Sequence, residues 1–163
     1  MISNDAEGRL TVQGISTTVN GSTETFVTSG QAEDLRVDLE GGADEVTLDG
    51  VSVEDRIRID GEGGNDSIAV METTARDLEV EGGNGNDVIQ ILDSVFSRRL
   101  DLEGQDGDDT LAINGVTTER NTDVTTGDGA DSLVIGDLDV GRRLRVSTGS
   151  GNDQVLILSL IHI

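Results

Sequence analysis

The sequence predicts an all-β fold: a parallel β-solenoid of the β-helix or β-roll type, with coils of about 22 residues. A glycine-rich turn recurs six times, and the aspartates of successive turns are separated by 22, 21, 22, 22 and 22 residues. In every copy a glycine stands two residues before the aspartate, and an aliphatic residue stands two residues after it. A fixed period of this length is typical of a solenoid in which each repeat forms one coil. The turn aspartates are Asp44, Asp66, Asp87, Asp109, Asp131 and Asp153.

Residues 1–34 lack this turn. They are rich in Ser, Thr, Asn and Gly, with short alternating stretches around Val12 and Phe26. Because the terminal repeats of solenoids are commonly atypical, we predict that this region forms one or two irregular capping coils. The alternative is that it is what remains of a preceding repeat in a longer parent protein.

Residues 35–157 contain the six regular copies. Apolar residues alternate with polar ones before the turn, after the turn and again in a short third stretch. The first copy shows this with Leu35, Val37 and Leu39, then Val46 and Leu48, then Val51 and Val53. A period of two within a period of 22 predicts strands that stack on their counterparts one coil away, about 4.8 Å apart. We therefore expect two long parallel sheets and a shorter third, with Thr122 the one poor match to the aliphatic pattern.

The end of the chain departs from the pattern. From Val155 onward the polar alternation is lost, and residues 158–163 form an apolar tail or truncated coil. An apolar strand at a sheet edge is a template for pairing with another chain. Three interpretations stay open: a fragment of a longer protein, a closing strand, or a face for end-to-end self-association.

Composition narrows the functional classes. The net charge is −22, from 33 acidic residues against 11 arginines, with no lysine or cysteine. Such a chain repels phosphates, so nucleic acid is not an expected partner. A spanning apolar run and a signal peptide are both missing from the sequence, and we expect no membrane insertion. Without Trp or Tyr, and with His162 alone in the apolar tail, we do not expect an enzyme.

Stacking should place the six turn aspartates in one column, which the pattern puts at a solvent-facing edge. Two such charges at 4 to 5 Å repel by about 1 kcal/mol in water and about 4 kcal/mol at the effective dielectric of a protein surface. The arginines of the repeats follow their aspartate by 10 to 12 residues, about half a coil away. A hard cation between adjacent turns would offset the repulsion, and Ca²⁺ suits because it accepts carboxylate and main-chain carbonyl oxygens. Further candidate ligands precede the aspartates, at Asn65, Asn86, Asp108 and Asn152.

One copy gives a specific resemblance. Residues 82–90, Gly-Gly-Asn-Gly-Asn-Asp-Val-Ile-Gln, match in full the nonapeptide of the RTX, or hemolysin-type, calcium-binding repeats, and the other five copies match it in part. The resemblance implies calcium ions between successive turns, with the six aspartates as shared ligands. The chain departs from that family because it has one such turn per 22-residue coil, where the family has two nonapeptides per coil.

These observations predict a calcium-binding structural segment of a secreted or cell-surface protein, RTX-like or adhesin-like. The alternative is a metal-independent, self-assembling structural β-solenoid, such as a filament or surface-layer component. The aspartates could also be plain turn residues, since Asp and Asn tolerate the left-handed conformation. The arginines that recur half a coil away could form an anion or polysaccharide surface, although nearby acidic residues favour local ion pairs. Scattered threonines weakly suggest an ice-binding ladder.

Overall fold

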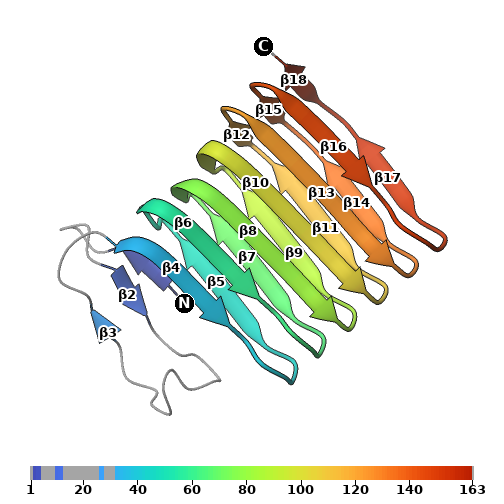
Figure 1. Ribbon diagram of the computed structural model, residues 1–163, viewed down its shortest axis with the longest axis horizontal. Coiled ribbons are helices and arrows are strands. Elements are labelled where there is room, and N and C mark those ends of the chain that lie inside the picture. Colours follow the sequence, from blue (N-terminus) through green and yellow to red (C-terminus); the bar gives the residue numbers. More distant parts are fainter. Residues whose placement is uncertain (1, 5–9, 13–25, 28–31, 163) are drawn as a thin grey trace.

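The computed structural model describes residues 2–4, 10–12, 26–27 and 32–162. These residues contain strands and no helix, and the strands stack as coils of about 22 residues in a β-solenoid of about six turns, which confirms the predicted fold class (Figure 1). No helix in this part of the chain is long and apolar enough to cross a membrane.

Each coil contributes strands to two sheets. The first sheet contains the strands that follow the glycine-rich turn: β5 (Glu45–Asp49), β7 (Ser67–Met71), β9 (Val88–Leu92), β11 (Thr110–Asn114), β14 (Ser132–Ile135) and β17 (Gln154–Ile157). All of them pair in parallel with their neighbours one coil away, with aliphatic residues aligned, as in Val46 with Ile68 and Ile68 with Ile89. Parallel pairing in constant register places equivalent residues of successive coils in columns.

The second sheet contains the strands that precede the turn: β4 (Ala32–Asp38), β6 (Val53–Asp60), β8 (Thr74–Asn84), β10 (Val95–Asp106), β13 (Asn121–Asp128) and β16 (Arg143–Ser147). The described residues form two sheets, so the expectation of a separate shorter third sheet was wrong. The short third stretch is present, but it is hydrogen-bonded within this second sheet. In β6, β8 and β10 it is continuous with the long strand. In later coils it forms β12 (Val116–Thr118), β15 (Leu138–Val140) and β18 (Leu160–His162).

The amino-terminal strands extend the first sheet. Strand β1 (Ile2–Asn4) pairs in parallel with β5, and β2 (Leu10–Val12) and β3 (Phe26–Val27) follow it in antiparallel pairs. Strand β4 begins at Ala32, inside the region 1–34 that was predicted to cap the solenoid. Most of the remaining residues of that region lie outside the described part of the chain, so the capping role stays a prediction.

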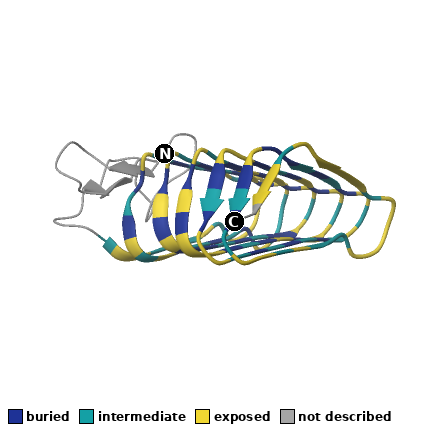
Figure 2. Cartoon of the chain, turned by 90° about the horizontal axis from the view of Figure 1, so that it is seen from above, coloured by how far each residue is buried: buried dark blue, intermediate teal, exposed yellow. Residues whose placement is uncertain are grey.

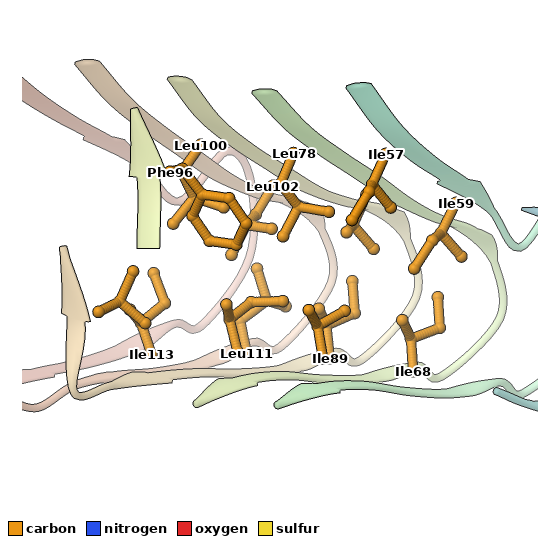
Figure 3. Packing of buried hydrophobic residues seen from close by; sticks show 14 of the residues in the cluster. Ile57, Ile59, Ile68, Leu78, Ile89, Phe96, Leu100, Leu102, Leu111 and Ile113 are labelled. Atoms are coloured by element: carbon orange, nitrogen blue, oxygen red, sulfur yellow. The ribbon is translucent and has the colours of Figure 1, made fainter. Parts of the chain in front are cut away.

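The core is a double layer of aliphatic side chains between the two sheets. Ile57, Leu78 and Leu100 of the second sheet face Ile68, Ile89 and Leu111 of the first, and all six are at most 1% exposed (Figure 3). Buried and exposed positions alternate along the coils (Figure 2). Burying one such side chain contributes about 1.5–3 kcal/mol, and stacking provides this burial to coils that could not bury their side chains alone.

Two buried threonines that depart from the apolar pattern are paired with each other inside the core. Thr122 is fully buried, and its hydroxyl lies 2.8 Å from the hydroxyl of Thr118, which is also buried. A buried hydroxyl costs little when it is hydrogen-bonded. The pair explains how a threonine is accommodated in an otherwise aliphatic column.

Candidate metal centre

The glycine-rich turn has a shape that only glycine satisfies at one position. The glycine two residues before each aspartate has φ between 132° and 150°. A Cβ atom added to Gly85 would lie 1.7 Å from the carbonyl oxygen of Gly64 in the preceding coil. Stacking turns this tightly therefore needs both the left-handed backbone and the missing side chain. These turns are aligned along one edge of the solenoid (Figure 1).

The six turn aspartates, which we call the aspartate column, are hydrogen-bonded from coil to coil. Oδ1 of each aspartate accepts the backbone N–H of the aspartate in the preceding coil. The N–O distances are 2.8 Å from Asp44 to Asp66, 2.8 Å from Asp66 to Asp87 and 2.8 Å from Asp87 to Asp109. They are 2.9 Å from Asp109 to Asp131 and 3.2 Å from Asp131 to Asp153.

The aspartate column is buried, which corrects the expectation that it lies at a solvent edge. Asp66, Asp87, Asp109 and Asp131 are only 1–2% exposed, while the end members Asp44 and Asp153 are half-buried. The expectation was wrong because the turn closes over the carboxylates: each side chain points along the stack to reach the amide of its neighbour and so lies beneath the glycines.

The second carboxylate oxygen has no partner. Oδ2 of Asp66, Asp87, Asp109 and Asp131 is buried without a hydrogen bond. For Asp66, Asp87 and Asp109 it faces the glycine five residues earlier, whereas Asp131 has Thr126 at that position. A Cβ added to Gly104, for example, would lie 2.4 Å from Oδ2 of Asp109 and 2.2 Å from the carbonyl oxygen of Thr126 in the next coil. Two acceptor oxygens thus flank this glycine, one from a carboxylate and one from the main chain.

Burial makes the charge of the column expensive. Desolvation raises the pKa of Asp66, and the neighbouring carboxylates of Asp87 and Asp44 raise it further. Desolvation also raises the pKa of Asp87, and it raises the pKa of Asp109 to about 6. The hydrogen bond from the neighbouring amide acts in the opposite direction and is the smaller effect. Among the described residues no arginine forms an ion pair with the column.

A second, exposed ladder runs beside the first. Oδ1 of Asn65 accepts the amide of Asn86 at 2.9 Å, Oδ1 of Asn86 accepts the amide of Asp108 at 2.9 Å, and Oδ1 of Asp108 accepts the amide of Ala130 at 2.8 Å. Asn152, the fourth residue predicted for this set, is exposed. Three of the four predicted side chains are therefore engaged in holding the turns together.

The donor set fits calcium in its chemistry. Buried carboxylate and main-chain carbonyl oxygens are the hard ligands that Ca²⁺ accepts. The ligands would be one unpartnered Oδ2 per coil with turn carbonyls, because no group of three acidic, His or Cys side chains converges within the described residues. Some turn carbonyls already accept amides of the preceding coil, as Asn84 does from Gly64 and Asp106 from Gly85, both at 2.8 Å.

One column of residues with positive φ was not predicted from the sequence. These residues directly follow the strands β5, β7, β9 and β11 of the first sheet. Gly50, Glu72, Asp93 and Gly115 all have φ between 46° and 67°. Only two of the four are glycine, so composition gave a weak signal. Their recurrence at intervals of 21 or 22 residues is the signal that could have identified them.

Comparisons with known proteins add no family assignment, because no family model, curated protein or solved structure matches the chain. The resemblance to RTX repeats therefore still depends on the nonapeptide of residues 82–90.

Proposed function

We propose that the chain is a calcium-binding structural segment of a secreted or cell-surface protein, in which Ca²⁺ meets the unpartnered Oδ2 atoms of the aspartate column. The β-solenoid itself is established. Calcium, the extracellular location and the adhesin-like role are the proposal.

The observation that carries the proposal is the contrast between the two adjacent ladders. Both accept a backbone amide through Oδ1, a role that the neutral side chains of Asn65 and Asn86 fulfil. The exposed ladder accordingly varies: its six positions are Ala43, Asn65, Asn86, Asp108, Ala130 and Asn152. The buried column is Asp in all six coils.

An amide acceptor alone does not explain six buried acids. Asparagine would preserve the hydrogen bond and avoid the cost of burying a charge, which is large without a partner. A buried carboxylate that is never replaced by its neutral isostere points to a role for the negative charge. A bound cation gives the charge that role and compensates its burial.

Calcium would also couple folding to location. A chain of net charge −22 repels itself, and a cation that binds only the folded state stabilises that state by an amount that grows with the logarithm of the cation concentration. Such a chain would be less stable where calcium is scarce and would gain stability where calcium is abundant, outside the cell.

The test is a calcium titration followed by far-UV circular dichroism and by isothermal titration calorimetry, with magnesium as the control ion. We expect calcium to increase the β signal or the unfolding temperature, and a chelator to reverse the effect. An unchanged β spectrum and unfolding temperature, with no heat of binding, would overturn the calcium proposal. The metal-independent self-assembling solenoid would then be the better interpretation.

A matched pair of variants separates the charge from the hydrogen bond. Asp87→Asn retains an oxygen that can accept the amide of Asp66 but removes the negative charge. We expect it to lose bound calcium, to be less stable than the wild type in calcium, and to be more stable than it in chelator. Asn86→Ala removes one acceptor of the exposed ladder and should leave the calcium stoichiometry unchanged. Equal stoichiometry in Asp87→Asn and the wild type would contradict the assignment of Oδ2 as a ligand.

A further inference from the structure

Arginines gather at the corner of the coil where the short stretch of the second sheet meets the long strand. The first residues of the long strands form an inner column of mixed charge, in which Arg56 pairs with Asp77, Asp77 with Arg99, Arg99 with Asn121, and Asn121 with Arg143. The residues one position earlier form the outer column of this corner: Glu33, Asp55, Arg76, Arg98, Arg120 and Arg142. This outer column changes from acidic to cationic and then stays cationic for four consecutive coils.

The counter-charges decrease along the same direction. Arg76 pairs with Asp55 at 3.1 Å, and Arg98 pairs with Asp77 at 3.3 Å. Arg120 and Arg142, in the next two coils, form no ion pair within the described residues. Arg120 and Arg142 lie in the bends between the strands, one coil apart, and like charges that close repel, so an unpaired arginine column is unfavourable unless an anion joins it.

The last three arginines of the outer column, Arg98, Arg120 and Arg142, line a shallow depression of about 340 Å³. Five guanidinium groups surround it, from Arg98, Arg99, Arg120, Arg142 and Arg143, and one carboxylate lies among them, that of Asp123. Asp123 lies 3.2 Å from Arg143 and 3.9 Å from Arg99, and Arg99 also forms an ion pair with Asp101. Because Arg98 pairs with Asp77, Arg120 and Arg142 are the two guanidiniums without a carboxylate partner among the described residues. The depression therefore has an excess of positive charge in a chain of net charge −22.

We propose that this depression, which we call the arginine groove, binds an anionic polysaccharide through its carboxylate or sulfate groups. Successive guanidiniums are one coil apart, about 4.8 Å, so they match a linear polymer with regularly repeated anionic groups lying along the solenoid axis. Arginine suits such groups because its planar guanidinium donates two parallel hydrogen bonds to one oxyanion.

Nucleic acid fits the groove less well. Single strands are bound by exposed aromatic side chains on which bases stack, but the chain has only two aromatic residues, and one of them, Phe96, is fully buried. A duplex would bring its dense phosphates against a strongly acidic surface. A polysaccharide contacts a narrow strip and is less exposed to that repulsion.

The test is fluorescence anisotropy with labelled heparin as the sulfated probe and polygalacturonate as the carboxylated probe. It uses the full chain in calcium-containing buffer, with circular dichroism confirming the fold of each variant. The double variant Arg120→Gln/Arg142→Gln should weaken binding about tenfold or more, because it removes two guanidiniums that donate charge-assisted hydrogen bonds to the anionic groups. The double variant Arg36→Gln/Arg56→Gln changes the net charge equally in other coils and should leave the affinity within about twofold.

Three results would overturn the proposal: no binding of either probe, equal weakening in the two double variants, or tighter binding of a single-stranded oligonucleotide than of either polysaccharide. The groove does not depend on the calcium proposal. If calcium changed neither the β spectrum nor the unfolding temperature, but the chain bound heparin through Arg120 and Arg142, the proposed function would be refuted and this inference supported.

Discussion

The two edges of each coil differ in burial and in how much the residue type varies from coil to coil. The aspartate column is buried, uses the same residue in six coils, and is joined at every step by a hydrogen bond from a backbone N–H to a carboxylate oxygen. The arginine corner is exposed, and its outer column changes from acid to arginine along the chain. The residue type is the same in every coil where equivalent side chains contact the neighbouring coil inside the stack. It varies where the equivalent side chains are exposed to solvent.

The one irregular spacing shows the same difference. Asp66 and Asp87 are 21 residues apart, one fewer than the other pairs. Ser52 pairs with Thr74, 22 residues on, but Arg56 pairs with Asp77, 21 residues on. The missing residue therefore lies between Thr74 and Asp77, at the arginine corner, and the aspartate column stays in register. The edge with close backbone contacts does not absorb a deletion, and the solvated corner does.

The largest expected effect concerns the tight edge. Gly104→Ala should destabilise the chain by about 3 kcal/mol or more, because its Cβ would meet the carbonyl oxygen of Thr126 at 2.2 Å, and main-chain atoms cannot move aside cheaply. Gly41→Ala is the control, since its Cβ would have an ordinary contact of 3.5 Å. Urea unfolding measures both. Similar losses in the two variants would mean that the edge is no tighter than its surroundings.

The second prediction uses the buried charge of the same edge. In chelator, the raised pKa of Asp109, about 6 against 3.8 when unfolded, means that the folded state binds more protons between these values. The stability from this protonation is fully present below about pH 4 and is lost as the pH rises through about 6. It amounts to at most about 3 kcal/mol.

Urea unfolding at several pH values checks this dependence. Asp109→Asn should reduce the fall in stability across that range because it removes the titrating group. An identical pH dependence in the wild type and Asp109→Asn would show that Asp109 does not carry the effect.

A third pair of variants compares a compensated arginine with an uncompensated one. Arg58 contacts Glu79 at 2.5 Å, Glu81 at 2.9 Å and Asp60 at 3.3 Å. Arg58→Gln should cost about 1 kcal/mol, more at low salt, because three carboxylates lose a shared partner. Arg120→Gln should leave the stability unchanged or slightly increased, since it removes a charge from a cationic column. Thermal unfolding at low and high salt measures both variants. An equal loss of stability in Arg58→Gln and Arg120→Gln would contradict the difference between a paired and an unpaired arginine.

The smallest effect concerns backbone strain in the turn. Glu62 has φ 60°, where the equivalent residue of the next coil is Gly83. Glu62→Gly should stabilise the chain by about 0.5 kcal/mol, because relief of a left-handed side chain exceeds the added entropy of glycine in the unfolded state. Denaturant midpoints measure this. A clear loss of stability would indicate that the Glu62 side chain contributes a favourable contact.

The period was sufficient to predict the solenoid, because a repeat of 22 residues with inner alternation has few other ways to bury Leu48, Ile57 and their equivalents. The aspartates were correctly placed in one column, as any register-preserving stack requires. Their burial was not predicted, because it depends on how the turn closes over Asp87 in three dimensions. An anion-binding arginine surface was one of the interpretations of the sequence, but nearby acidic residues favoured local ion pairs. Which arginines have a carboxylate partner depends on pairing between coils, such as that of Arg98 with Asp77, and the sequence alone did not show it.

The coil length itself has a mechanical consequence. Each coil stores about 22 residues within one strand spacing of about 4.8 Å, whereas the same residues fully extended span about 75 Å. Pulling a single coil out of the stack would lengthen the molecule by about 70 Å while the other coils kept their contacts. A tether made of such coils is stiff under small loads and yields in long, discrete steps under large ones.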